Sequence, residues 1–343
     1  MDTIRLGKTN IVTNKNGFGA LPIQRISRSD AAYLLRKALD GGISYFDTAR
    51  GYTDSEEKIG YAFDGIARDK YFLASKTTAL ETRTFWEQLE TSLRLLKTDY
   101  IDVYQFHNPP FCPGLAGDET GLYEAALEAQ KQGKIRFISI TNHRLKVARS
   151  AIESGLYATL QFPFSYLASD VEKQLVLDCE KNDMGFISMK ALAGGLIHDS
   201  ALAYAFQSEW PALPIWGIQR EDQLDEFLSY IENPPAMTDE RRAAIEKEQK
   251  ELAGDFCRGC GYCTPCPEGI QIFDLARMSL MLRRAPVQSY TTPEWQEKMH
   301  KVEHCRKCGL CASRCPYGLD TPKVLKYMLE DYRAFYESHK DQL

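Results

Sequence analysis

Eight of the ten cysteines in this 343-residue chain lie in two tight runs near the C-terminus. The first run contains Cys257, Cys260, Cys263 and Cys266, and the second contains Cys305, Cys308, Cys311 and Cys315. Packing alone does not require a thiol at every third position, whereas an iron–sulfur cluster needs several thiolates that converge. The spacing therefore predicts two [4Fe-4S] clusters, and with them one-electron chemistry.

Two other uses of these cysteines remain open at this point. A disulfide framework needs an oxidising compartment, and the first residues lack the charged and apolar segments of a secretory signal. Structural zinc also binds paired Cys-x2-Cys elements, but two dense runs of four cysteines, each followed by proline, fit clusters better. Cys112 and Cys179 lie outside the runs and are expected to be ordinary thiols.

A second group of residues could act on a carbonyl or alcohol group: Asp47, Tyr52, Lys76 and His107. Tyrosine has an ordinary pKa of about 10, and a neighbouring lysine ammonium stabilises the phenolate and lowers that pKa. A carboxylate would keep the lysine charged and in place, and a histidine could donate a hydrogen bond to the substrate oxygen. Each residue alone has a structural explanation. Together they predict protonation of a C=O group while hydride reaches its carbon.

The elements that must position these residues alternate regularly between strand and helix up to about residue 235. The predicted strands are Asn16–Leu21, Ile43–Asp47, Tyr71–Lys76, Ile101–His107, Ile135–Thr141, Thr159–Phe164, Gly185–Ala191 and Pro214–Ile218. Apolar residues recur between them at three- and four-residue steps, which indicates helices with one buried face. Eight such units predict an α/β fold, the (β/α)8 TIM barrel. A doubly wound sheet is the alternative, but Gly17-Phe18-Gly19 lacks the third glycine of its nucleotide-binding turn.

In such barrels catalytic groups come from the C-terminal ends of strands and the loops that follow. Asp47, Lys76 and His107 each end a predicted strand, and Tyr52 follows Asp47 by five residues. Each strand-end residue has the parity of apolar residues earlier in its strand: Asp47 matches Ile43 and Tyr45, Lys76 matches Phe72 and Ala74, and His107 matches Ile101 and Val103. If those apolar residues face the barrel interior, the three polar side chains do as well.

The chain divides into three predicted parts. Residues 1–235 form the barrel, preceded by a small hairpin over Thr3–Thr13 with a turn at Gly7-Lys8. Residues 236–254 are densely charged and predict a solvated connecting helix. Residues 255–343 form a small α-rich, ferredoxin-like domain that holds the clusters and ends in a helix.

Composition limits the partners. A net charge of −5 without a basic tract argues against nucleic acid, and no apolar run approaches the roughly 20 residues of a membrane span. We expect a cytoplasmic protein.

On its motifs the sequence resembles the aldo-keto reductase superfamily, in the branch with a C-terminal ferredoxin-like 4Fe-4S domain. The motifs are Phe46-Asp47-Thr48-Ala49 with Tyr52, Ser75-Lys76, Ile101-Asp102-Val103-Tyr104-Gln105-Phe106-His107, and Gly133-Lys134-Ile135-Arg136. The resemblance implies a nicotinamide-dependent carbonyl reductase or alcohol dehydrogenase. It places the catalytic tetrad on Asp47, Tyr52, Lys76 and His107, with Tyr52 as general acid or base.

The resemblance also implies contacts to NADP or NAD. Thr141 and Asn142 take the place of the pair that holds the carboxamide, and Gln161 that of a glutamine on the sixth strand. Met189 replaces the tyrosine that stacks on the nicotinamide ring, offering sulfur but no flat π surface. Three further candidates are Lys190, Gly217 in the turn after the eighth strand, and Arg220. For Lys190 and Arg220 a phosphate contact and an exposed surface charge are equally open.

The second cysteine run matches the bacterial ferredoxin pattern, and the first is one residue shorter. In such ferredoxins the fourth cysteine of each run binds the other cluster. The resemblance therefore implies the following two sets: Cys257, Cys260, Cys263 and Cys315 for one cluster, and Cys305, Cys308, Cys311 and Cys266 for the other. The clusters could carry electrons, with FMN as a possible mediator, or could be structural in a domain without a core of its own.

Three functions follow. The first is an oxidoreductase acting on a small carbonyl or alcohol. The second is an electron-transfer protein that uses a flavin or a ferredoxin-type redox partner and has little nicotinamide activity. The third is a lyase or isomerase that reuses the same acid/base group. The sequence does not define the substrate.

Overall fold

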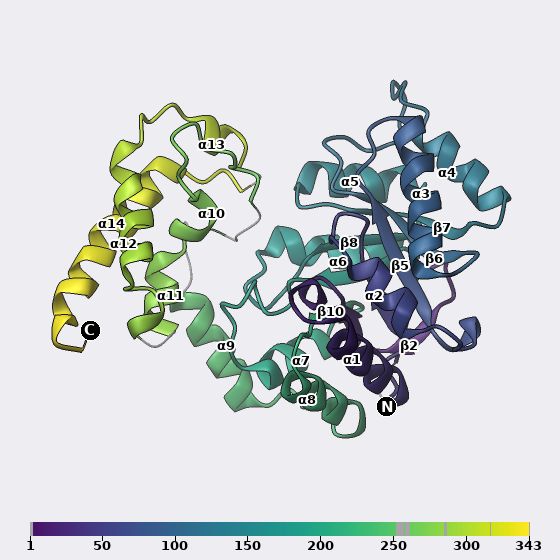
Figure 1. The fold of residues 1–343 in the computed structure, drawn as a ribbon, viewed down its shortest axis with the longest axis horizontal. Coiled ribbons are helices and arrows are strands. Elements are labelled where there is room, and N and C mark those ends of the chain that lie inside the picture. Colours follow the sequence, from purple (N-terminus) through teal and green to yellow (C-terminus); the bar gives the residue numbers. More distant parts are fainter. Residues whose placement is uncertain (1–2, 252–256, 258–260, 285–286, 316, 343) are drawn as a thin grey trace. The chain divides into compact units, whose positions relative to one another are not determined.

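The computed structural model describes residues 3–251, 257, 261–284, 287–315 and 317–342. The chain forms two compact units (Figure 1). The first comprises Met1–Leu192 and Asp199–Arg242, and the second comprises Ala193–His198 and Ala243–Leu343. Among the described residues, no helix is both long enough and apolar enough to cross a membrane.

The first unit is a closed barrel of eight parallel strands, as the sequence predicts. In chain order the strands are β3 Gly17–Gly19, β4 Tyr45–Asp47, β5 Phe72–Thr77, β6 Ile101–His107, β7 Ile135–Thr141, β8 Thr159–Pro163, β9 Gly185–Met189 and β10 Leu213–Gly217. Each strand pairs with the next, and β10 pairs with β3 to close the ring. This closure rules out the doubly wound sheet.

Helices follow the strands and cover the barrel (Figure 1). They are α1 Arg28–Asp40, α2 Ser55–Ala62, α3 Thr82–Leu96, α4 Leu122–Lys131, α5 Leu145–Ser154, α6 Asp170–Lys181, α7 Ser200–Ser208 and α8 Glu221–Glu232, with short 3-10 turns η1 Pro22–Arg25 and η2 Arg68–Lys70. The buried face of α3 is the predicted one, with Phe85, Leu89, Leu93 and Leu96 all in the core. The three- and four-residue spacing therefore identified the correct helix face.

A hairpin closes the N-terminal end of the barrel. Its strands, β1 Thr3–Arg5 and β2 Val12–Asn14, pair antiparallel. The predicted turn at Gly7-Lys8 is confirmed, because the Thr9 N–H donates to the Leu6 carbonyl oxygen at 3.2 Å across these two residues. Apolar residues of the hairpin and of the strand interiors form one buried cluster: Ile4, Leu6, Ile11, Tyr45, Ala74, Val103, Ile187, Leu213 and Ile215. The predicted inward parity of β4, β5 and β6 is thus confirmed.

The described part of the second unit is helical, with several short helices and one long helix, α14 Thr321–Ser338. The others are α9 Asp239–Glu251, α10 Ile272–Leu275, α11 Met278–Arg284, η3 Val287–Ser289, α12 Pro293–His300, η4 Lys301–His304, α13 Leu310–Ser313 and η5 Lys340–Gln342. The expectation that this region lacks a core is wrong. Buried side chains from α10, α11, η4 and α14 pack together, among them Ile272, Leu275, Met278, Val302, Leu325 and Met328.

We expect Gly60→Ala to destabilise the first unit. Gly60 lies in α2, where an added Cβ would clash with the backbone carbonyl oxygen of Leu95 and lie 2.9 Å from the carbonyl carbon of Leu96. Backbone atoms cannot move aside cheaply, so overpacking should cost about 1–3 kcal/mol. Thermal unfolding measures this loss. Glu57→Ala, at an exposed position of the same helix, is the control, and equal melting temperatures for the two variants would contradict the expectation.

Candidate active site and cysteine cavities

A buried ion pair lies at the centre of the barrel site. Asp47 is the last residue of β4, and Lys76 lies one residue before the end of β5. The Lys76 ammonium donates hydrogen bonds to Asp47 Oδ1 at 2.5 Å and to the Thr48 carbonyl oxygen at 2.7 Å. The two side chains are only 1% and 2% exposed. Burial raises the pKa of Asp47, while the Lys76 ammonium opposes that rise.

Two amides hold the carboxylate from other strands. Gln105 Nε2 on β6 donates to Asp47 Oδ2 at 3.1 Å, and Gln161 Nε2 on β8 donates to Asp47 Oδ1 at 3.5 Å. The amide oxygens of both glutamines are buried and accept no hydrogen bond. Gln161 was expected to contact the cofactor, and no role in the site was predicted for Gln105. The parity that Gln105 shares with Val103 and His107 could have identified it.

Tyr52 lies in the loop between β4 and α2, beside the ion pair. The Lys76 ammonium is 5.2 Å from the centroid of the Tyr52 ring. The His107 ring meets the same ring edge to face, at 5.7 Å between centroids. Tyr52 is partly exposed, unlike Asp47 and Lys76. Tyr52, together with the partly exposed His107, is therefore accessible to a substrate, whereas the ion pair is not.

The pKa of Tyr52 corrects a sequence-based expectation. Lys76 does lower this pKa, but burial raises it more, so the pKa lies above the ordinary tyrosine value. Tyr52 is consequently a neutral phenol at neutral pH and can donate a proton. The predicted direction was wrong because only the ammonium was considered, whereas desolvation also disfavours the phenolate.

His107 ends β6 and is neutral. Burial, with a smaller contribution from Lys76, lowers the pKa of His107 to about 3. Its Nδ1 atom is buried without a hydrogen-bond partner. A neutral imidazole has one N–H donor and one nitrogen acceptor, so His107 can donate to a substrate oxygen without carrying a charge.

A buried carboxylate fastens the Tyr52 loop to the barrel. Glu56, in the first turn of α2, accepts a hydrogen bond from Ser75 Oγ at 2.6 Å and pairs with Arg50. Arg50 in turn donates to the Thr53 carbonyl oxygen at 3.1 Å. Ser75 directly precedes Lys76, so Glu56 links the loop to β5. The sequence analysis overlooked Glu56, because a glutamate in the first turn of a helix normally faces solvent.

The expected cofactor residues at the end of β7 lie near one another and already have partners. Thr141 Oγ1 donates to the Met189 sulfur at 3.9 Å. Asn142 Nδ2 donates to the Pro109 carbonyl oxygen at 2.9 Å, and Asn142 Oδ1 accepts from the backbone of the next two residues. The Asn142 side chain therefore shapes the loop that begins α5.

The other residues expected to contact the cofactor lie after β9 and at or after the end of β10. Lys190 follows β9 with a left-handed φ of 56°, and Gly217 ends β10. Arg220 is exposed, and its guanidinium binds both carboxylate oxygens of Asp222, at 2.9 and 3.0 Å. His143 was overlooked. Burial lowers its pKa well below the ordinary value, with further contributions from Lys190 and His107.

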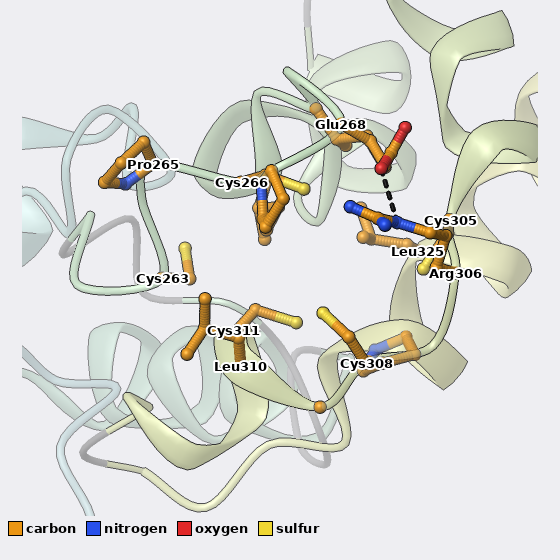
Figure 2. A pocket seen from close by; sticks show the side chains of 15 residues that line it. Cys263, Pro265, Cys266, Glu268, Cys305, Arg306, Cys308, Leu310, Cys311 and Leu325 are labelled. Atoms are coloured by element: carbon orange, nitrogen blue, oxygen red, sulfur yellow. Dashed lines mark ion pairs between the residues drawn. The ribbon is translucent and has the colours of Figure 1, made fainter.

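In the second unit, cysteines from both runs line two cavities. The larger, about 420 Å³ of space that includes its opening to solvent, is lined by Cys263, Cys266, Cys305, Cys308 and Cys311. Figure 2 shows the side chains of Cys308 and Cys311 pointing toward each other within it. The second cavity, of about 380 Å³, is lined by Cys257, Cys263 and Cys315. Cys260 lies outside the described residues.

The cysteine thiols around both cavities are the type of ligand that iron–sulfur clusters use. Within the described part of the chain, no three cysteine, histidine or carboxylate groups are arranged to bind one metal ion. In a cluster each thiolate binds a different iron atom, so the sulfur atoms stand further apart. An ion pair at 2.5 Å between Glu268 and Arg306 joins the two runs at the larger cavity (Figure 2).

Comparison with known proteins supports both parts. Residues 13–200 match the Aldo/keto reductase family, and residues 256–320 match the 4Fe-4S dicluster domain. The chain is 32% identical over 177 residues to the aldo-keto reductase YhdN of Bacillus subtilis, which covers 48% of this chain and 52% of that protein. It is 28% identical over 229 residues to L-galactose dehydrogenase of Arabidopsis thaliana, covering 61% and 70%.

Solved structures show the same fold. An aldo-keto reductase from Klebsiella pneumoniae in complex with NADPH superposes with a TM-score of 0.60 at 21% identity, covering 72% of this chain and 95% of that chain. The aldo-keto reductase AKR11C1 from Bacillus halodurans, in its holo form, gives 0.61 at 22% identity, covering 72% and 96%. The chain spans about half the length of YhdN.

We expect the His107 imidazole to stay neutral between about pH 8 and about pH 5, because burial lowers its pKa to about 3. Titration of the histidine resonances by NMR tests this, with His107→Gln identifying the signal. The unfolded chain binds this proton near pH 6.5. The contribution of His107 to stability is thus complete above that pH and is lost as the pH falls toward 3. A His107 signal that titrates near pH 6.5 would contradict the burial argument.

Proposed function

Because the chain belongs to the aldo/keto reductase family, we propose that it is an oxidoreductase that reduces a small carbonyl compound, with Tyr52 as proton donor. One observation carries the proposal. A partly exposed, neutral phenol lies beside a lysine ammonium that is held in the barrel by a buried carboxylate. The same group in reverse would oxidise an alcohol.

The chain's own residues supply the proton and the orientation. Tyr52 would transfer its proton to the substrate oxygen as hydride arrives at the carbon, and Lys76 would stabilise the phenolate that forms. The neutral His107 would donate a hydrogen bond to the same oxygen. Since the pKa of Tyr52 is raised, its proton is present throughout the neutral range, which favours reduction. Oxidation, which needs the phenolate as base, should speed up as the pH rises.

A bound nicotinamide would supply the hydride. The buried Gln161 Oε1, which accepts no hydrogen bond, could receive one from its carboxamide, and Thr141 and Asn142 lie on the neighbouring strand end. Arg220 is engaged by Asp222, so binding to the phosphate of NADP would compete with that ion pair. We propose NADP or NAD as the cofactor. Met189, at the end of β9, would contact the nicotinamide ring.

The second unit would hold two [4Fe-4S] clusters. Cys266, Cys305, Cys308 and Cys311 of the larger cavity would bind one cluster, and Cys257, Cys263 and Cys315 of the second cavity would bind the other, although Cys263 lines both cavities. Thiolates at these positions would bind the iron atoms. Because this unit has an apolar core, it does not depend on clusters alone for its stability. We therefore favour a role of the clusters in electron transfer. Cysteines that bind iron must not form disulfides, and the cytoplasm keeps thiols reduced, so we propose a cytoplasmic location.

A second candidate is an electron-transfer protein with bound FMN and little nicotinamide activity. The engagement of Arg220 by Asp222 favours it, because that pair occupies the guanidinium expected for the NADP phosphate. Anaerobic titrations with NADPH, NADH and FMN distinguish the two candidates. Tight FMN binding without binding of either nicotinamide would support the second.

Tyr52→Phe should lower the rate of NADPH-dependent reduction of a panel of small aldehydes by about 10²–10⁴-fold, because the proton donor is lost. Its affinity for NADPH should change little. Tyr61→Phe, on the exposed side of α2, is the matched control and should keep full activity. If Tyr52→Phe retained the wild-type rate while binding NADPH, another group would be the acid.

Single cysteine variants test the cluster assignment. Anaerobically purified protein should contain about eight iron atoms, and Cys305→Ser and Cys266→Ser should each lose the same cluster, leaving about four. Cys179→Ser, at a buried position in the first unit, is the control and should keep all of them. EPR spectra of the reduced variants identify the cluster that remains. If Cys266→Ser instead removed the cluster that Cys257→Ser removes, each run would hold its own cluster.

A further inference from the structure

The cysteines of the two cavities differ in their access to solvent. Among the described cysteines that line them, Cys308 of the larger cavity is exposed, and the others are buried (Cys257, Cys263 and Cys311) or half-buried (Cys266, Cys305 and Cys315). The larger cavity therefore reaches the surface at Cys308. An electron that leaves or enters a group bound there has its shortest path through this side of the unit.

Basic side chains lie on both sides of the larger cavity. Arg306 lines the cavity next to Cys308, and its side chain is 65% exposed. Lys307, which is exposed, follows in sequence. Arg314 is also exposed and donates to the Pro265 carbonyl oxygen at 3.3 Å, and Pro265 lines the same cavity. In a chain with a net charge of −5, this surface is locally positive.

Little acidic charge offsets this surface. Of the described residues that line the cavity, only Glu268 is acidic, and it is already paired with Arg306. Within the described ranges, Lys307 and Arg314 form no ion pair. Leu310, between Cys308 and Cys311, is 36% exposed and adds an apolar contact. A basic rim around a small apolar centre is typical of the small interfaces of transient redox complexes.

The basic residues could instead offset the negative charge of bound thiolates. Because Lys307 and Arg314 are exposed, high-dielectric water weakens their contribution to that function. The exposed positions of Lys307 and Arg314 suit a different purpose. Exposed charges steer an oppositely charged partner over distances of about a Debye length and raise its association rate.

We propose that Arg306, Lys307, Leu310 and Arg314 form a docking surface for an acidic one-electron carrier protein of the ferredoxin type. The inference rests on the proposed clusters. In each encounter one electron would pass between the group held by Cys308 and the partner's cofactor, so one is oxidised and the other is reduced by one electron.

The test compares two charge reversals in the full-length holoprotein. One variant is Lys307→Glu/Arg314→Glu. The matched control is Lys247→Glu/Lys340→Glu, which makes the same change in net charge at side chains that are 77% and 55% exposed. The probe is a fluorescently labelled, oxidised plant-type [2Fe–2S] ferredoxin, which is acidic. Binding is measured by anisotropy at low salt, and basic cytochrome c serves as the probe of opposite charge.

We expect ferredoxin to bind the wild type and the control alike, and the Lys307/Arg314 variant at least about tenfold more weakly. Raising the salt should weaken wild-type binding, and cytochrome c should gain no affinity from the basic surface. Equal binding by the two variants, or no binding by the wild type, would overturn the proposal. Iron content is measured on every sample. A wild type without iron would refute the proposed clusters, whereas intact clusters without charge-dependent binding would refute only the docking surface.

Discussion

The site in the first unit depends on the buried contact between the Lys76 ammonium and the Asp47 carboxylate. Neither charge could remain in the barrel interior alone, because removing one partner of a buried pair leaves an uncompensated charge at a cost of about 3–5 kcal/mol. Together they are stable, and Gln105 and Gln161 bind the remaining surface of the carboxylate. This arrangement fixes a positive charge at one point, and Tyr52 and His107 lie around that point.

Burial shifts the pKa values of these two neighbours in opposite directions, upward for Tyr52 and downward for His107. It favours the neutral form of each, so the phenol of Tyr52 retains its proton and the imidazole of His107 remains without one. The site therefore contains the protonated phenol of Tyr52, the neutral imidazole of His107 and the fixed ammonium of Lys76. A carbonyl oxygen that develops negative charge is stabilised there without any charge having to move into the barrel beforehand.

The barrel could be predicted from the sequence because strand spacing, parity and strand-end chemistry are local properties. The same rules identified Asp47, Lys76 and His107. Glu56 and His143 could not be found in this way, since their burial is created by loops and helices that fold over them. The core of the second unit was also missed. Some of its apolar residues come from helices as short as α10, with four residues, which are too short to show a period. Others lie on α14, where the spacing is periodic but the sequence does not show what the buried face packs against.

The direction in which the pKa of Tyr52 shifts could not be predicted from the sequence either. A sequence can show that a lysine will be a neighbour, but the loss of water around both groups depends on the closed structure. In the second unit, the two cysteine runs were visible in the sequence, yet the unequal exposure of their thiols was not.

Finally, the hairpin of β1 and β2 closes the N-terminal end of the barrel. This apolar cluster separates that end of the barrel from Tyr52 and His107, which lie at the C-terminal ends of the strands and in the loops that follow. A ligand at these two residues would therefore enter and leave from the opposite side of the barrel.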